Sequence, residues 1–392
     1  MPMDLRTLFM LRPEVAFLNH GSFGACPRPV MAQYQSWQLE SETEPVEFHA
    51  RRAAGLLQTA REALGELVGA DANDLVYVTN ATVAVNIVAR SLRLGPTDEV
   101  LGTDHEYGAC ERVWRFLSTR GGPRYRSAHI PVPVTTHEDM IEQLFSQIGP
   151  DTRVIFISHI TSPTALTFPI AEVCRRAREL GLMTIVDGAH VPGQMSLNLR
   201  EIDPDFYTGN LHKWLCAPKG AAFLYARNEL QPMLDPLVVS WGYESIFDGP
   251  SQFIDAHEYR GTRDISPALT VPFAIDFQRE HNWKDVIAEC HAMVKRARPL
   301  IAEALDAVPI APEGPASSNG DATEWYVQMS AFLLPDGYDR LSLGTRLFDE
   351  HQVEIPTFGW NDRQTIRISI QGYNTWNDVE RLLDGIRAIR NR

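Results

Sequence analysis

Two hydrophobic patterns alternate along the first half of the chain. Short runs rich in Val and Ile, such as VIFIS and MTIVD, are separated by longer segments whose apolar residues recur at helical spacing. Buried strands that alternate with amphipathic helices are typical of a mostly parallel sheet with helices on both faces. The pattern therefore predicts an α/β fold over about residues 52–226.

The pattern changes after this unit. Residues 227–270 are irregular, aromatic and rich in glycine, and helical periodicity dominates from about residue 271, with strands expected at 324–332 and 365–370. A second, α+β unit is the natural interpretation. We therefore expect three parts: an N-terminal segment (1–17), a large α/β domain (18–270) and a smaller C-terminal α+β domain (271–392).

Composition narrows the class of protein. The 392 residues include 36 basic and 50 acidic side chains, so the formal net charge is -14 and the surface repels phosphate backbones and anionic lipids. Five scattered cysteines without C-x-x-C spacing indicate neither a disulfide framework nor a zinc site, and the twelve histidines lack metal-ligand spacing. The first residues lack the apolar stretch of a signal peptide, and we find no apolar run of 18 residues. We expect a cytoplasmic protein with no nucleic-acid partner, no membrane span and no metal.

Polar residues follow five of the expected strands. In an open parallel sheet, ligands bind at the carboxyl ends of the strands. Five clusters of polar residues at the ends of the expected strands therefore indicate a binding site at that edge. The segments are Thr79–Thr82, Asp104–Tyr107, Ser158–Ser162, Asp187–His190 and Asn210–Lys213.

Asp187 and Lys213 are the most informative pair. Asp187 ends an apolar run, where a buried carboxylate needs a partner. An Asp that keeps a pyridine nitrogen protonated, together with a Lys that binds the aldehyde, is the minimum protein equipment for pyridoxal phosphate (PLP) chemistry. A purely structural Asp–Lys ion pair explains the spacing equally well.

The motifs around these residues resemble those of a known family. VDGAH followed by GNLHKWLCAPKGAAFLY resembles the class V aminotransferase family of fold-type I PLP enzymes, and within it the isopenicillin N epimerase-like proteins. Further matches run in the family's order over about residues 15–375: FLNHGSFGACPRPV, TNATVAVN, DHEYGA, SHITSPTALTFPI, GTRD and IRISIQGYNT. The resemblance implies the fold-type I architecture, PLP as cofactor, and a homodimer with shared active sites acting on a small amino-acid substrate.

The resemblance also implies roles around the pyridine ring. Lys213 is expected to be the Schiff-base lysine and Asp187 the partner of the ring nitrogen. His190 is expected beside the ring, unless it is only a loop histidine bonded to backbone. His105 is expected to stack on the ring face opposite the lysine, with Tyr107 as the alternative.

Other residues are expected at the phosphate, the ring hydroxyl and the substrate. Asn80 and Thr82 have an alternative interpretation as helix N-caps, and Arg367 as a surface residue. The implied phosphate group is Asn80, Ala81, Thr82, Asn210 and His212, with Thr262 contributed by the neighbouring subunit. Thr161 or Ser162 is implied at the ring hydroxyl, and Arg367 at the substrate α-carboxylate, where a planar guanidinium pairs well.

The reaction is less determined than the cofactor. The likeness favours epimerisation at Cα, with β-elimination by a C–S lyase and transamination as alternatives, because none of these leaves a separate sequence signature. Cysteine desulfuration of the persulfide kind needs a loop cysteine in the small domain, and the last cysteine, Cys290, falls in an expected helix. A rival of another class is a catalytically silent α/β binding protein. A nucleotide-binding protein is disfavoured, since no phosphate-binding glycine motif follows a strand.

Overall fold

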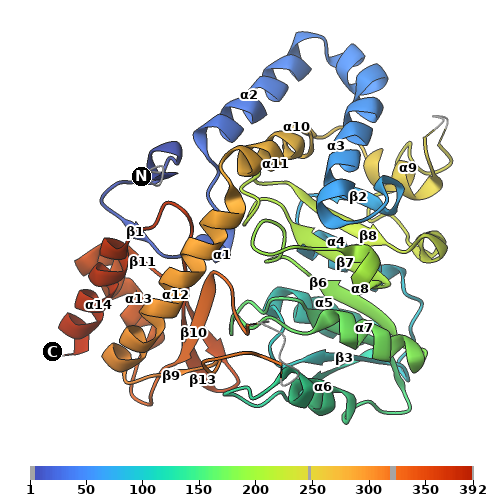
Figure 1. Ribbon diagram of the computed structural model, residues 1–392. Helices are drawn as coiled ribbons and strands as arrows, with labels where there is room; N and C mark the ends of the chain where they lie inside the picture. Colours follow the sequence, from blue (N-terminus) through green and yellow to red (C-terminus); the bar gives the residue numbers. More distant parts are fainter. Residues whose placement is uncertain (1–4, 246–248, 318–323, 391–392) are drawn as a thin grey trace.

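The computed structural model describes residues 5–245, 249–317 and 324–390. Its centre is a seven-stranded sheet with the strand order β2-β8-β7-β6-β5-β3-β4 (Figure 1). The strands are β2 (Leu75–Val78), β3 (Glu99–Thr103), β4 (Arg124–Ala128), β5 (Thr152–Ser158), β6 (Met183–Asp187), β7 (Phe206–Asn210) and β8 (Ala222–Ala226).

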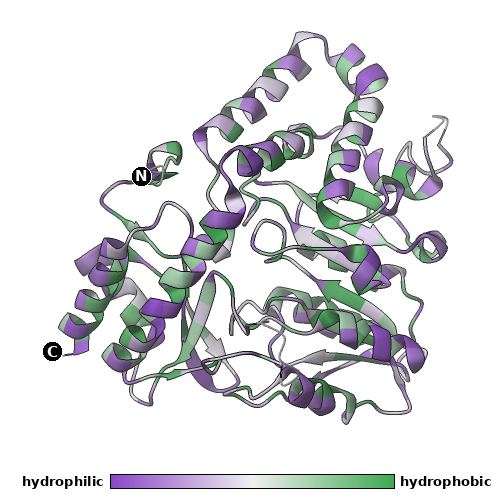
Figure 2. Ribbon diagram, viewed as in Figure 1, coloured by the Kyte–Doolittle hydropathy of each residue, from purple (hydrophilic) through white to green (hydrophobic). Residues whose placement is uncertain are grey.

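Helices cover both faces of this sheet, as the alternation of patterns predicts. Val154 and Phe156 of β5 pack in one apolar cluster with helices α4 and α5, whereas Ile155 and Ile157 belong to the core on the other face, with α3 and α7. Figure 2 shows the apolar strands enclosed by helices that are polar on their outer side. The helices of this part are α1 (His20–Phe23), α2 (Arg28–Thr43), α3 (Ala53–Val68), α4 (Ala81–Ser91), α5 (Gly108–Ser118), α6 (His137–Phe145), α7 (Ile170–Glu179), α8 (Leu199–Ile202), α9 (Gln252–Glu258), α10 (Ser266–Leu269) and α11 (Val271–Glu280).

The strand directions place the carboxyl ends of β2 to β7 on one edge of the sheet. β3 pairs in parallel with β4 and β5, and the parallel ladder continues through β6 to β7. β8 lies antiparallel between β7 and β2, so β2 runs in the same direction as β7. The prediction of a mostly parallel α/β sheet is confirmed, and the reversed β8 is the exception.

A smaller antiparallel sheet, of order β12-β13-β10-β9, lies beside the large one. The long helix α12 carries the chain to this sheet from α11, which packs against α2 and α3 (Figure 1). The short strand β1 pairs with β11, so the N-terminal segment joins the C-terminal part. The elements are β1 (Ala16–Phe17), β9 (Val308–Pro309), β10 (Met329–Leu333), β11 (Val353–Glu354), β12 (Thr357–Trp360), β13 (Arg363–Ser369), α12 (Trp283–Leu305), α13 (Arg340–His351) and α14 (Trp376–Arg390).

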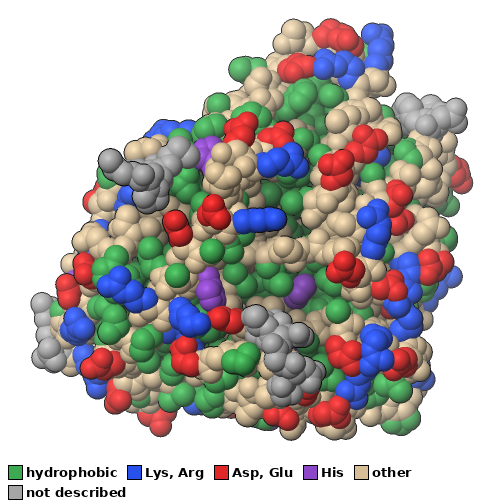
Figure 3. All heavy atoms as spheres, in the orientation of Figure 1, with side chains coloured by type: hydrophobic (Ala, Val, Ile, Leu, Met, Phe, Trp, Pro, Cys, Tyr) green, Lys and Arg blue, Asp and Glu red, His purple; other side chains and the backbone are tan. Residues whose placement is uncertain are grey.

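This smaller part agrees with the expected α+β pattern, with one strand shorter than expected. β10 begins at Met329, whereas the sequence pattern suggests a strand from residue 324; residues 318–323 lie outside the described part of the chain. The domain boundaries after residues 17 and 270 stay predictions. Figure 3 shows the face of the molecule that is hollowed near its middle, with apolar side chains visible between scattered acidic and basic ones.

Candidate active site

A cavity of about 470 Å³ lies at the carboxyl edge of the large sheet. Ten of the residues that the sequence singles out for the cofactor site line it: Asn80, Ala81, Thr82, Tyr107, Ser162, Asp187, His190, Asn210, His212 and Lys213. A larger cavity, of about 620 Å³, lies between α6, α7 and residues 195–202, and none of the predicted site residues lines it. Because the predicted site residues gather at the smaller cavity, we take it as the candidate active site.

Asp187 ends β6 and is almost fully buried at the cavity wall, with 3% of its surface exposed. Its Oδ1 accepts the backbone N–H of Ala189 at 3.0 Å, and among the described residues its Oδ2 accepts only the weak thiol donor of Cys110 at 3.6 Å. Burial raises the pKa of Asp187, while the nearby Lys213 opposes that rise. A desolvated carboxylate with so weak a donor on Oδ2 favours a cationic partner.

Lys213 follows β7 and is half-buried in the same cavity. Desolvation, followed by the positive charge of Arg367, lowers the pKa of Lys213 to about 8. Its Nζ lies 3.2 Å from Nε2 of His190. Only the neutral amine of a lysine attacks an aldehyde, and a lowered pKa makes that form more abundant at pH 7.

His190 is oriented by the residue that follows the lysine. The indole N–H of Trp214 donates to Nδ1 of His190 at 3.2 Å, and burial lowers the pKa of this imidazole far below its usual value. A neutral imidazole that accepts at Nδ1 carries its proton on Nε2. His190 therefore presents an N–H to the Lys213 nitrogen, which accepts it only as the neutral amine.

The start of α4 forms an anion site beside these groups. Asn80 is the N-cap of α4, because its Oδ1 accepts the N–H of Val83 at 2.9 Å. The N-cap interpretation is therefore correct for Asn80, which also lines the cavity. Oδ1 of Asn210 accepts the N–H of Ala81 at 2.9 Å, which ties β7 to this helix terminus. Helix N-termini attract phosphate through their N–H groups and the helix dipole. A phosphate at this wall of the cavity would lie beside Thr82.

His212 lies on the same wall of the cavity. Its Nδ1 donates to the carbonyl oxygen of Ala221 at 3.1 Å, and burial lowers its pKa to about 4. The imidazole is therefore neutral at pH 7 without a ligand, and a phosphate dianion beside it would raise that pKa.

Arg367 reaches the site from the smaller sheet. It belongs to β13 and is 1% exposed, so it is not a surface residue. Nη1 donates to the backbone oxygen of Ser162 at 2.6 Å and Nη2 to the hydroxyl of Ser22 at 3.4 Å, while Nε has no hydrogen-bond partner among the described residues. Burial lowers the pKa of Arg367 to about 9. A buried guanidinium without a carboxylate partner among these contacts is suited to an anionic ligand.

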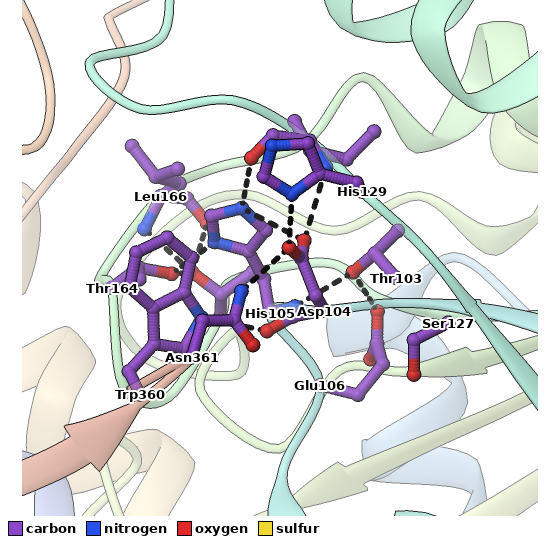
Figure 4. A network of polar contacts seen from close by, with 12 residues as sticks. Thr103, Asp104, His105, Glu106, Ser127, His129, Thr164, Leu166, Trp360 and Asn361 are labelled. Carbon is purple, nitrogen blue, oxygen red and sulfur yellow. Dashed lines mark hydrogen bonds and ion pairs between the residues drawn. The ribbon is translucent and has the colours of Figure 1, made fainter. Parts of the chain in front are cut away.

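The expectation that His105 stacks on the ring is wrong. His105 is fully buried outside the cavity lining, because Thr164 Oγ1 binds its Nδ1 at 2.8 Å and the carbonyl of Ile130 binds its Nε2 at 3.0 Å (Figure 4). Tyr107, the alternative, lines the cavity and is 47% exposed. A side chain whose two polar atoms are satisfied inside the protein has no reason to turn toward the cavity.

Two other predicted residues lie outside this cavity. Thr161 is fully buried, and its hydroxyl pairs with Thr164 Oγ1 at 2.7 Å and accepts the N–H of Leu166 at 2.8 Å. Of the two candidates for the ring hydroxyl, Ser162 is thus the one at the cavity. Thr262 is exposed, and its role toward a neighbouring subunit stays a prediction.

Sequence reasoning missed part of the cavity wall. Ser22 and Phe23, from α1, line it, although their motif served only as a family likeness. Gly24 explains the close approach of this segment: its φ is 69°, and a Cβ there would lie 2.2 Å from the carbonyl oxygen of His212. The two glycines of the GSFGA segment were the available signal.

A second buried acid stands behind the cavity. Glu106 is 5% exposed, and its two carboxyl oxygens bind the hydroxyls of Thr103 and Ser158, each at 2.6 Å. Ser158 itself lines the cavity. Burial raises the pKa of Glu106 to about 8, so this carboxyl group is mostly neutral at pH 7.

Comparison with known proteins identifies the family. The family model described as aminotransferase class-V matches residues 24–324. Isopenicillin N epimerase of Streptomyces clavuligerus is 35% identical over 396 residues, which cover 98% of each chain. This chain belongs to the class V aminotransferase family.

Other relatives fit the same placement. A protein described as probable L-cysteine desulfhydrase, chloroplastic, of Arabidopsis thaliana is 30% identical over 411 residues, covering 96% of this chain and 83% of its own. The crystal structure of the cysteine desulfurase CsdA of Escherichia coli superposes with a TM-score of 0.80 at 21% identity, covering 100% and 99% of the two chains. The expected fold-type I architecture and PLP dependence are thereby confirmed.

The cavity fits PLP in the chemistry of its donors. It combines a desolvated carboxylate, a lysine with a lowered pKa and a helix N-terminus in about 470 Å³. In the described part of the chain, no group of three or more His, Cys, Asp or Glu side chains is arranged to hold a metal ion. The helices described are each too short or too polar to cross a lipid bilayer.

Proposed function

We propose that this PLP enzyme inverts the configuration at Cα of an amino acid or amino-acid-derived substrate, as an epimerase. The observation that carries the proposal is the pair of proton-transfer groups on one cavity: the Lys213 amine, with its pKa near 8, and the Tyr107 hydroxyl. Inversion requires the Cα proton to be removed from one face and a proton to be returned to the other, either by two groups or by one base that serves both faces; we propose the two-group form. The similarity to isopenicillin N epimerases supports this reaction.

Each remaining residue has a defined task in this proposal. Bound PLP supplies the electron sink that acidifies the substrate Cα–H bond. Asp187 keeps the pyridine nitrogen protonated, and the α4 N-terminus with Asn210 and His212 holds the phosphate. Arg367 binds the α-carboxylate, Lys213 takes the proton, and Tyr107 returns one.

A C–S lyase is the second candidate, because the chain is also 30% identical to L-cysteine desulfhydrase relatives over 96% of its length. β-Elimination needs Lys213 and a good leaving group, without Tyr107, and transamination is likewise independent of Tyr107. Persulfide transfer is unsupported, because all five cysteines are buried and none lines the cavity.

One experiment separates these reactions. The PLP-loaded enzyme is incubated in deuterium oxide with the separate L and D forms of amino acids and with L-cysteine. Chiral chromatography separates the two enantiomers, and the deuterium content at Cα, the sulfide and the oxo acid are measured. An epimerase converts each enantiomer to the other with deuterium at Cα, and Tyr107→Phe stops inversion while exchange on one face continues. Sulfide release without inversion would refute the epimerase and establish the lyase. Oxo acid formed without sulfide, and only when a second oxo acid is added to accept the amino group, would establish transamination.

We also propose a cytoplasmic homodimer in which Thr262 reaches the partner's phosphate group. Thr262 is exposed, and Nε and Nη2 of the adjacent Arg263 have no hydrogen-bond partner among the described residues although both are buried. The five free cysteines suit a reducing compartment. Sedimentation of the purified enzyme tests the dimer. Mixing Lys213→Ala with Thr262→Val chains would restore some activity if the sites are shared, and none if Thr262 serves only its own chain.

A further inference from the structure

The hairpin of β12 and β13 ends in a turn that touches the large part of the molecule. Asn361 and Asp362 form the turn with φ of 45° and 57°, the left-handed conformation that a two-residue type I′ hairpin turn requires. The amide Nδ2 of Asn361 donates to Oδ2 of Asp104 at 2.6 Å, and Nε1 of Trp360 donates to the Asp104 backbone oxygen at 2.6 Å (Figure 4).

Further hydrogen bonds fix the Asp104 carboxylate in place. Oδ2 also binds Nδ1 of His129 at 2.7 Å, and Oδ1 accepts the N–H of Ile130 at 3.0 Å. The Trp360 ring lies 4.9 Å from the ring of His105 and is only 7% exposed. The hairpin tip is therefore clamped on the loop that follows β3, and His105 belongs to this joint.

The same hairpin carries Arg367, which contacts Ser162 and Ser22 of the cavity lining. Arg367 lies on β13, four residues beyond the turn-flanking Arg363, so roughly 13 Å of strand separates it from the joint. Lys213 follows β7 of the large sheet and Arg367 lies in the small sheet, so their separation depends on how the two sheets are fixed together. Along the strand, Thr365 Oγ1 donates to the Pro163 carbonyl at 3.4 Å and Arg367 donates to Ser162, which places the middle of β13 against the large part.

We infer that Asn361 and Trp360 are positioning residues that hold Arg367 at its working distance from Lys213, and so set the affinity for substrates with an α-carboxylate. The inference rests on the proposed role of Arg367. If the joint loosens, a smaller fraction of molecules has Arg367 in place, and the apparent affinity for the carboxylate falls by that fraction.

The test compares two glycine substitutions in the same turn. Asn361→Gly removes the amide that binds Asp104, and glycine adopts the positive φ without strain. Asp362→Gly, one residue on, changes the turn equally and leaves both contacts to Asp104 intact. Trp360→Phe is a second variant, which keeps the ring on His105 and removes the indole N–H.

Each PLP-loaded protein is titrated with L-alanine and with L-alaninamide, which lacks the carboxylate, and binding is followed by the visible absorption of the cofactor. Asn361→Gly and Trp360→Phe are expected to weaken L-alanine binding by about three- to tenfold and to leave L-alaninamide binding unchanged. Asp362→Gly is expected to match the wild type. PLP content, measured after denaturation, is expected to stay constant.

Several results would overturn the inference, and they differ from failure of the proposed function. Equal weakening for acid and amide, loss of PLP, or wild-type binding in Asn361→Gly would show a joint with no role in carboxylate binding. A wild-type enzyme that does not prefer L-alanine to L-alaninamide would remove the carboxylate role of Arg367, and the inference with it. If neither compound changes the absorption of the wild-type enzyme, the proposed function fails first.

Discussion

The lowered pKa of Lys213 makes a quantitative prediction about PLP attachment. With a pKa of about 8, roughly 10% of the amine is neutral at pH 7, against about 0.03% for a lysine at 10.5. The reactive form is thus about 300 times more abundant than in an ordinary lysine. The rate of attachment of PLP to the apoprotein is expected to rise with pH, with a midpoint near 8, and then level off.

Two substitutions should move this midpoint in opposite directions. The positive charge of Arg367 lowers the pKa of Lys213 and the negative charge of Asp187 raises it, with desolvation as the largest cause. Arg367→Met is therefore expected to move the midpoint above 8, and Asp187→Asn to move it below. A midpoint that is higher by about one on the pH scale corresponds to a roughly tenfold smaller neutral fraction at pH 7.

The assay is rapid mixing of apoprotein with PLP between pH 6 and 10, followed by visible absorption. Lys213→Ala is the blank, and Arg363→Met, an exposed arginine on the same strand as Arg367, is the matched charge control. A wild-type midpoint near 10.5 would refute the desolvation argument. Midpoints that move in the same direction in both variants would refute the assignment of the two opposing charges.

Three further predictions concern the catalytic step and stability. Asp187→Ala should retain covalent PLP but slow deuterium exchange at substrate Cα by about 100-fold or more, because the ring nitrogen loses its anion; exchange at the wild-type rate would refute the electron-sink role. Lys213→Met should raise the free energy of unfolding of the apoprotein at pH 7 by about 1–3 kcal/mol in urea titrations, since a partly desolvated ammonium is removed; a less stable variant would contradict the desolvation penalty. The pKa of Glu106, raised to about 8, means that its stabilising contribution is complete below the unfolded-state pKa near 4.5 and is lost as pH rises to 8. Glu106→Gln, which does not ionise, should therefore gain in unfolding free energy relative to the wild type between pH 5 and 8, by up to about 4 kcal/mol, and a constant difference would contradict the raised pKa.

Local patterns predicted the elements that position the cofactor residues. The apolar run before Asp187 and the polar residues before α4 define a strand end and a helix start, and each lies where the pattern places it. The reversed β8 was not predictable, because an apolar strand has the same pattern in either direction. The choice between His105 and Tyr107 depended on distant partners, Thr164 and Ile130, which hold the histidine inside.

Contacts between distant segments account for the remaining differences. No periodicity indicates that the loop around Gly24 packs on the backbone of His212, or that Arg367 is buried rather than exposed. These positions follow from the packing of the N-terminal segment and the small sheet on the large one. The residue types indicated a PLP site, and the tertiary structure shows which of these residues lie together in it.

The cavity is lined by residues between Ser22 and Lys213, and Arg367, from near the end of the chain, contacts two of them, Ser22 and Ser162. During synthesis on the ribosome, a chain of about 230 residues already holds the strands of the large sheet, but neither β13 nor the strand partner of β1 exists yet. The complete pocket is therefore a product of the finished polypeptide. A ligand stabilises only the folded state that binds it, so PLP would protect completed chains from unfolding and degradation and give little protection to truncated ones. When PLP is scarce, newly made chains that have not yet bound it should therefore be degraded first.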